Sequence, residues 1–197
     1  VATGQVCVLC TGRVPNTESI APENAGIETI RGYIPVDEQL RSNVASIYAI
    51  GDVNGKHALA HAAMAQGKAV AAEMASRPHR FRDDAVPSCI YTAYETAWVG
   101  LSQTQAETRG YTVRVGRYHI PATGKALVSG VDTGLVKIVS DAKTGKLLGA
   151  AIISPRATDM IAEIAALISL NATAADLADT VHPHPTLSEV MGEAADD

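Results

Sequence analysis

The stretch LVKIVSDAKTGKLLGAAIIS, residues 135–154, contains two apolar segments separated by a short polar one. Residues 135–140 and 147–154 are rich in β-branched and other apolar residues, and the segment between them has the Asp, Thr and Gly of a turn. We therefore predict an antiparallel hairpin. Three further strands are expected, at residues 88–92, 97–101 and 112–120. The second part of the chain should accordingly form an antiparallel sheet.

Helices should flank this sheet. The sequence predicts helices at residues 103–109, 155–171 and 174–179, and a last one that begins near Thr186. In the longest of these, five apolar residues recur at helical spacing: Met160, Ile161, Ile164, Leu167 and Ile168. One face of that helix is therefore apolar, and we expect it to pack on the sheet or on another subunit.

The first part of the chain has a different pattern. Apolar runs at residues 5–10 and 46–50 predict two buried strands of the kind found in parallel sheets, with a hairpin-like stretch at 31–36 between them. Residues 58–76 are rich in Ala and contain no Pro, which predicts a long helix that ends at Arg77-Pro78. No cap or turn precedes the first run, so we expect the chain to begin inside a truncated domain.

A charged segment, residues 79–84, separates the two patterns. We place a domain boundary there and predict two domains, residues 1–82 and residues 83–197. The predicted fold class is α/β followed by α+β.

Composition excludes several classes of protein. With 197 residues, of which 47% are hydrophobic, the chain can close one good core or two modest ones. The net charge of -5 and the lack of a Lys and Arg cluster argue against a surface for nucleic acid or anionic membrane. No stretch approaches the roughly 20 apolar residues of a membrane-spanning helix, and no secretion signal is present. The odd number of cysteines, 3, predicts a reducing, cytoplasmic setting.

Cys7 and Cys10 have the spacing of a redox motif, but we interpret them otherwise. On a strand, residues three apart point to opposite faces, so the two thiols would not meet. We expect both to be small core side chains.

Gly51 and Asp52 end the second predicted strand, and after a short loop the long helix begins at Ala58-Leu59-Ala60-His61. Crevices between the end of a strand and the start of a helix bind nucleotides in many folds. Gly51 would let a ligand approach the backbone, Asp52 would accept hydrogen bonds from polyol hydroxyls, and the first helical amides would stabilise negative charge on a flavin ring. The alternative is a helix cap beside a turn glycine.

The segment Val181-His182-Pro183-His184-Pro185-Thr186-Leu187-Ser188-Glu189 places two imidazoles on backbone that proline keeps extended. Glu189 could orient His184 and favour its protonated form, which would give an acid/base pair. Alternatively, Thr186 and Glu189 could form a capping box at the start of a helix. A His-x-His metal site is a third reading, but the sequence offers two nitrogens and no further ligand at suitable spacing. We therefore assign no metal ligand.

Four segments occur in the order and spacing of one known family: Thr11-Gly12-Arg13-Val14-Pro15-Asn16-Thr17, Tyr48-Ala49-Ile50-Gly51-Asp52, Ala97-Trp98-Val99-Gly100 and His184-Pro185-Thr186-Leu187-Ser188-Glu189. In them the chain resembles the class I flavoprotein pyridine nucleotide-disulfide oxidoreductases, and the last segment resembles their dihydrolipoamide dehydrogenases in particular. The resemblance covers essentially the whole chain. It implies that residues 1–82 are the C-terminal remnant of an FAD/NAD-binding region and that residues 83–197 are a dimerisation domain.

The resemblance also implies roles for individual residues. Asp52, beside Gly51, and the run Ala58, Leu59, Ala60 and His61 fall where the family holds FAD, and Gly12 falls at the NAD site. His184 and Glu189 match the family's acid/base dyad, which faces the flavin and redox disulfide of the other subunit. The dyad takes a proton from a dithiol, and electrons then pass through FAD to NAD. The implied partners are a second copy of the chain and the lipoyl-bearing proteins of 2-oxo acid dehydrogenase complexes.

The chain also departs from the family pattern. It has neither the two reactive cysteines separated by four residues nor a Gly-x-Gly-x-x-Gly loop, so we expect the isolated chain to be inactive. Tyr94 stands where the family usually has proline. The alternatives are a glutathione reductase-like enzyme, which Leu187-Ser188-Glu189 disfavours, and a dimerisation module without catalysis.

Overall fold

A computed structural model describes residues 3–79 and 81–197. The chain divides into two compact units, Val1–Phe81 and Arg82–Asp197. Among the described residues, no helix combines the length and the apolar character needed to cross a membrane.

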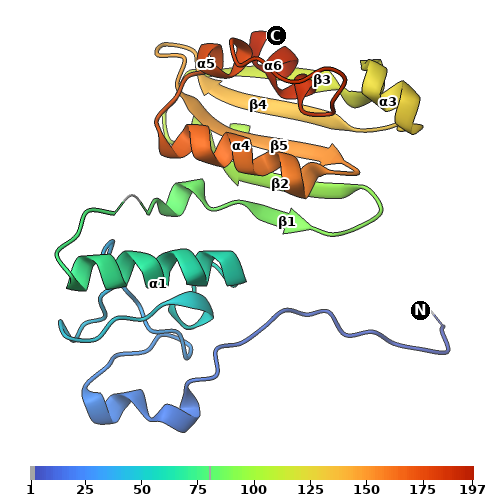
Figure 1. Cartoon of the computed structure of the whole chain (residues 1–197). Helices are drawn as coiled ribbons and strands as arrows, with labels where there is room; N and C mark the ends of the chain where they lie inside the picture. The colour runs from blue at the N-terminus through green and yellow to red at the C-terminus, as the bar shows by residue number, and fades with distance from the viewer. Residues whose placement is uncertain (1–2, 80) are drawn as a thin grey trace. The chain divides into compact units, whose positions relative to one another are not determined.

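The second unit is built on a five-stranded antiparallel sheet with the order β1-β2-β5-β4-β3 (Figure 1). The strands are β1 (Ser88–Ile90), β2 (Glu95–Gly100), β3 (Val113–His119), β4 (Leu135–Asp141) and β5 (Leu147–Ser154). The predicted hairpin is confirmed, because β4 and β5 pair on either side of the turn that the polar segment forms. All five predicted strands are present, with bounds that differ by a few residues.

Helices cover this sheet as the apolar spacing predicts. They are α2 (Gln103–Thr108), α3 (Gly124–Ser129), α4 (Ala157–Ser169), α5 (Ala174–Ala178) and α6 (Glu189–Asp196), with 3-10 turns at Asp83–Ala85 and Ile120–Ala122. The α4 helix packs on β2 and β5, and α6 packs on β3 and β4. Four of the five apolar residues identified on α4 are buried in one core with the sheet, and Leu167 packs at its edge. The apolar face of α4 therefore lies on its own sheet rather than on another subunit.

Close backbone approach fixes α6 on β3. A Cβ atom added to Gly116, in the middle of β3, would lie 1.8 Å from the carbonyl oxygen of Ala194. Arg114 Nη2 donates to the carbonyl of Asp196 (2.8 Å), and the amide of Arg117 donates to the side chain of Asp197 (3.1 Å). Glycine at position 116 is thus what allows α6 to lie directly on the strand.

Two adjacent side chains, one at the start of β2 and one just before it, tie the sheet to its surroundings. Glu95 Oε2 accepts from the amide (2.9 Å) and the hydroxyl (2.7 Å) of Thr158, in the first turn of α4. These hydrogen bonds lower the pKa of Glu95. Tyr94, where the sequence departs from the family pattern, donates its hydroxyl to Asp132 Oδ1 (2.7 Å). This residue therefore links its loop to the segment before β4.

The first unit contains one long helix, α1 (Ala60–Met74), and 3-10 turns at Glu18–Ile20, Pro22–Ala25 and Gly51–Asn54. The predicted helix at 58–76 is therefore confirmed. The hairpin-like stretch is a tight turn, in which Ile30 and Tyr33 exchange backbone hydrogen bonds of 2.8 and 3.0 Å.

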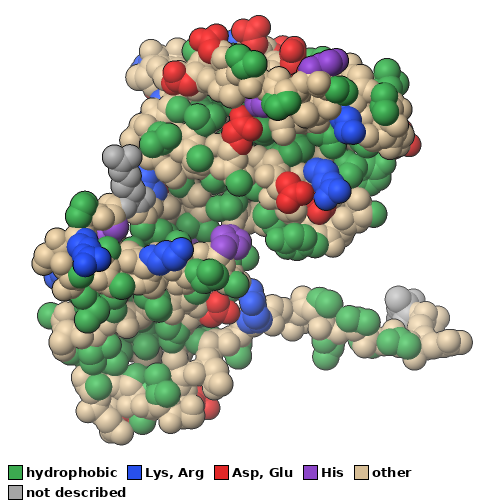
Figure 2. Space-filling model, viewed as in Figure 1, with side chains coloured by type: hydrophobic (Ala, Val, Ile, Leu, Met, Phe, Trp, Pro, Cys, Tyr) green, Lys and Arg blue, Asp and Glu red, His purple; other side chains and the backbone are tan. Residues whose placement is uncertain are grey.

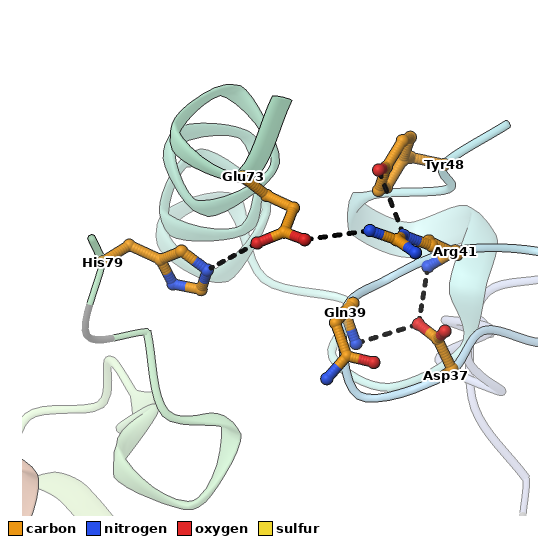
Figure 3. A network of polar contacts seen from close by, with 6 residues as sticks. All are labelled: Asp37, Gln39, Arg41, Tyr48, Glu73 and His79. Atoms are coloured by element: carbon orange, nitrogen blue, oxygen red, sulfur yellow. Dashed lines mark hydrogen bonds and ion pairs between the residues drawn. The ribbon is translucent and has the colours of Figure 1, made fainter. Parts of the chain in front are cut away.

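A polar network joins the last turn of α1 to the loop that precedes Tyr48 (Figure 3). Arg41 donates to Glu73 Oε1 (2.9 Å) and to the hydroxyl of Tyr48 (3.1 Å), and Asp37 accepts from the amide of Arg41 (2.8 Å). The Nε2 atom of His79 lies 3.9 Å from the other oxygen of Glu73. The network therefore links α1 to this loop through side chains that are partly exposed.

The two buried strands predicted for this unit are wrong. Residues 5–10 are extended but pair with no strand among the described residues, and Val6 and Leu9 are 82% and 83% exposed. Cys7 and Cys10 are likewise exposed rather than in a core. A strand of a parallel sheet is buried by strands on either side and by helices on both faces, and the described part of this unit supplies no neighbouring strand. Apolar side chains stand along this segment in Figure 2.

Residues 46–50 also form no sheet strand. Tyr48 makes an isolated bridge with Arg41, and the amide of Ala49 donates to the carbonyl of Leu40 (3.1 Å). Ala49 and Leu40 are nevertheless buried, so the apolar pattern reports a local core rather than a strand between two neighbours.

Candidate functional site

The segment before α6 brings His184 and Glu189 together. The Nδ1 atom of His184 lies 2.7 Å from Glu189 Oε1, and the amide of Thr186 donates to Glu189 Oε2 (2.7 Å). The peptide bond between His184 and Pro185 is cis. Each carboxylate oxygen of Glu189 thus has its own partner. Glu189 binds the histidine and also accepts a backbone hydrogen bond, so the two interpretations of this residue are both correct.

The capping box itself is only half formed. The α6 helix begins at Glu189 rather than near Thr186, and Ser188 precedes its first residue. The Thr186 hydroxyl oxygen is buried and has no hydrogen-bond partner among the described residues. Thr186 therefore binds Glu189 through its backbone amide alone.

Electrostatics keeps Glu189 ionised. The pKa of Glu189 lies below its ordinary value, first because of the hydrogen bond from the Thr186 amide and then because of the hydrogen bond to His184. A carboxylate beside Nδ1 favours the tautomer that carries its hydrogen there. The Nε2 atom is then the free base, on a side chain that is 76% exposed. The pair can exchange a proton with a molecule that approaches from solvent.

His182 has a different environment. Its side chain is 8% exposed, and its Nε2 atom lies 2.9 Å from Oε1 of Glu163, in α4. The two histidines therefore bind different carboxylates. Among residues 3–79 and 81–197, no group of three or more His, Cys, Asp or Glu side chains could hold a metal ion. Glu163 was not among the site residues predicted from the sequence. The only sign of it in the sequence is its position next to Ile164, on the predicted helix.

The residues predicted to hold a flavin lie at the start of α1. Gly51 has a left-handed φ of 76°, and its amide donates to Oε1 of buried Gln66 (2.7 Å). A side chain at Gly51 would contact Ala63, since an added Cβ atom would lie 3.0 Å from the Ala63 Cβ atom. The packing of α1 therefore requires glycine at position 51, and Gly51 is itself buried.

Asp52 is exposed and lies beside a residue that sequence reasoning left out. The Asp52 Oδ2 atom is 3.5 Å from Nη1 of Arg13, and the other terminal nitrogen of Arg13 donates to the carbonyl of Ala58. Arg13 follows Gly12, which has a φ of 101° and open space where a side chain would be. The structure thus brings Arg13, the residue after Gly12, into contact with Asp52 and Ala58.

The first turn of α1 completes this region. Leu59 precedes the helix, Ala60 and His61 begin it, and the amide of Ala63 makes the first backbone bond along the helix, to the carbonyl of Leu59 (3.0 Å). The first amides of a helix point outward from its N-terminal end. They form a positive end next to Ala58 and Asp52.

Comparison with known proteins gives two family matches. Residues 86–195 match the pyridine nucleotide-disulphide oxidoreductase dimerisation domain, and residues 2–67 match the pyridine nucleotide-disulphide oxidoreductase domain. The chain is 43% identical to a dihydrolipoyl dehydrogenase of Thermus scotoductus over 190 residues, which is 96% of this chain and 41% of the relative. It is 44% identical to that of Bacillus subtilis over 185 residues, 93% of this chain and 39% of the relative. The chain thus spans about two-fifths of the length of these relatives.

Two solved structures also match the chain. LpdA from Mycobacterium tuberculosis matches with a TM-score of 0.86 at 30% identity, over 93% of this chain and 40% of that one. The HOCl-induced flavoprotein disulfide reductase RclA from Escherichia coli matches with a TM-score of 0.83 at 28% identity, over 95% of this chain and 44% of that one. With more than half of its residues matched to the dimerisation domain, the chain belongs to the pyridine nucleotide-disulphide oxidoreductase family.

Proposed function

We propose that the chain is the C-terminal part of a cytoplasmic, FAD-dependent dihydrolipoyl dehydrogenase that oxidises a dihydrolipoyl group with NAD. The observation that carries the proposal is the contact of 2.7 Å between His184 Nδ1 and Glu189 Oε1, which leaves the exposed Nε2 atom free. The sequence relatives named above support the choice of substrate, because both are dihydrolipoyl dehydrogenases.

In this proposal His184 is the acid/base residue. Its Nε2 atom accepts the proton of one thiol of the substrate, and the thiolate so formed attacks a disulfide of the other subunit. Glu189 stabilises the resulting imidazolium, because its carboxylate is already ionised and in contact with Nδ1. The second thiol of the substrate then displaces the first sulfur, which leaves the substrate oxidised to its disulfide and the other subunit's disulfide reduced to a dithiol. FAD, when bound, would carry the two electrons from that dithiol to NAD.

The residues at the start of α1 fit one end of FAD. Asp52 offers an exposed carboxylate for ribityl hydroxyls, and the first amides of α1, from Ala60 and His61, offer positive charge to the flavin ring. Gly51, Ala58 and Leu59 would allow close approach of the ligand, and Gly12 would line the neighbouring NAD site. Arg13 joins this set, because it holds Asp52 and Ala58 together.

The partners follow from the same proposal. We infer that the chain forms a homodimer through the unit that matches a dimerisation domain, and that lipoyl-bearing proteins of 2-oxo acid dehydrogenase complexes supply the substrate. The three free cysteines, Cys7, Cys10 and Cys89, are compatible with a reducing compartment.

The test uses the parent enzyme that we propose, with three variants. His184→Gln should lower lipoamide turnover by roughly 10²- to 10⁴-fold while flavin content stays the same. Glu189→Gln should lower it less, since glutamine still accepts a hydrogen bond but has no charge. His119→Gln is the control, because His119 lies on β3 with an exposed side chain. Equal turnover in all three variants would overturn the proposal.

A mixing experiment tests the contribution across subunits. A heterodimer of one subunit with His184→Gln and one subunit without its redox cysteines should recover one active site of two. If both parental variants fold and dimerise but no mixture regains activity, His184 does not act on the other subunit. A dimerisation module without catalysis, the rival function, would give no turnover in any form of the protein.

A further inference from the structure

We propose that His182 and Glu163 form a positioning pair that holds His184 and Glu189 in contact. The inference rests on the proposed function of His184 and adds a residue from another helix, α4, to its support. Neither member of the pair would touch the substrate.

The first observation is the burial of His182. Its side chain is 8% exposed, whereas that of His184, two residues later, is 76% exposed. The Nε2 atom of His182 lies 2.9 Å from Glu163 Oε1, and the Glu163 side chain is 33% exposed. A hydrogen bond to a partly buried carboxylate is stronger than one at the surface. The ring of His182 is therefore anchored to α4.

The second observation is that the same ring contacts α6. A Cβ atom added to Gly192 would lie 3.6 Å from both Cε1 and Nδ1 of His182, so the ring packs against the helix backbone there. Gly192 lies three residues after Glu189, and residues three apart share a helix face. His182 thus touches the helix that carries Glu189 one turn beyond that residue.

The third observation is the connection between His182 and His184. One residue, Pro183, separates them, and its ring fixes one backbone torsion and restricts the residue before it. A displacement of His182 should therefore displace His184 as well. Through this short segment and through α6, the pair with Glu163 determines where both partners of the 2.7 Å contact lie.

The charges around His182 agree with this arrangement. A polar hollow of about 180 Å³ adjoins the ring and is lined by Ala178, Thr180, His182, Glu189, Gly192 and Glu193. Carboxylates of α4 and α6 thus face the ring of His182 from both helices. Acidic side chains also gather over the part of the unit that α5 and α6 occupy (Figure 2).

The experiment measures which nitrogen of His184 carries the hydrogen, by the ¹⁵N shifts of its ring in the labelled chain. In the wild type the hydrogen should lie on Nδ1, and Glu189→Ala should shift it toward Nε2. Glu163→Ala should shift it in the same direction, whereas Glu163→Gln, which keeps an acceptor, should restore it. Asp159→Ala is the matched control, since Asp159 lies on the same helix in an exposed ion pair with Arg156 (3.6 Å). A second variant, Glu163→Asp, withdraws the carboxylate by one carbon and should shift the hydrogen even if Glu163→Ala fails to fold.

Kinetics of the parent enzyme supplies an independent readout. Glu163→Ala and Glu163→Asp should lower kcat by about 10- to 100-fold with little change in KM, as loss of a residue that orients a functional histidine does. Glu163→Gln should recover most of the activity. Should the ¹⁵N shifts of His184 stay at their wild-type values in Glu163→Ala and Glu163→Asp, the pair is merely structural and the inference is wrong. If His184→Gln instead retains turnover, the proposed function fails, while the ¹⁵N shifts still decide whether Glu163 positions His184.

Discussion

Substitution of Gly116 by Ala tests the contact that seats α6 on the sheet. The added Cβ atom would lie 1.8 Å from the carbonyl oxygen of Ala194, and the φ of Gly116 is not in the left-handed region, so the effect is steric rather than conformational. Restoring ordinary contact requires α6 to move by more than about 1 Å from β3. If α6 adjusts in place, overpacking should destabilise the unit by about 1–3 kcal/mol.

A larger effect is expected if α6 undocks. Val190 and Met191 are fully buried, and exposing each would forfeit about 1.5–3 kcal/mol, so the loss would reach about 3–6 kcal/mol. Urea unfolding followed by the fluorescence of Trp98, the single Trp of the chain, reports on the unit that contains α6. Gly124→Ala is the control, because Gly124 begins α3 with nothing within 4 Å of an added Cβ atom. A free energy of unfolding for Gly116→Ala equal to that of Gly124→Ala would refute the close approach of β3 and α6.

Three further outcomes are expected. Ile164→Ala should lower the free energy of unfolding by about 2–5 kcal/mol, because Ile164 is fully buried. In the same urea titration, Leu170→Ala should change it by under about 0.5 kcal/mol, because the Leu170 side chain is 63% exposed. Asp132→Asn should lower the pKa of Tyr94, which the hydrogen bond and the charge of Asp132 raise; an unchanged tyrosinate titration would contradict the contact. The pKa of Glu189 is depressed below 4.5 in the folded protein. Its contribution to stability is therefore present above that pH and is lost as pH falls through the folded pKa. The difference in urea midpoint between wild type and Glu189→Gln should accordingly shrink below about pH 4.5.

The sheet of the second unit could be predicted because its signals are local. The turn between β4 and β5 has characteristic residues, and the apolar spacing of α4 repeats over three turns. The α3 helix escaped prediction for the opposite reason. Its Leu127 and Val128 are exposed and only Ala126 is buried, so no periodic apolar face marks it.

The strand predicted at residues 5–10 failed because burial of a strand is not a property of the strand alone. An apolar run is typical of a central parallel strand only when neighbours cover both of its faces. In the described residues these neighbours are absent, and the same side chains that would fill a core are exposed.

In the candidate site, too, some contacts could be predicted from the sequence and others could not. His184 and Glu189 are five residues apart, so their contact was accessible from spacing and from the resemblance. Glu163 lies on another helix, and only the packing of α4 brings it to His182. Arg13 likewise reaches Asp52 across a loop of the first unit. Contacts that depend on tertiary packing leave no trace in sequence spacing.

The strand order β1-β2-β5-β4-β3 has a kinetic consequence. Three of its four adjacent pairs join strands that follow one another along the chain, and only the pair of β2 and β5, in which Gly100 lies opposite Gly149, joins distant ones. Local pairs close short loops and form early, while a distant pair requires a long loop to close first. The seam between β2 and β5 should therefore form late and limit the folding rate, and α4, which packs on both of these strands, can consolidate only after it.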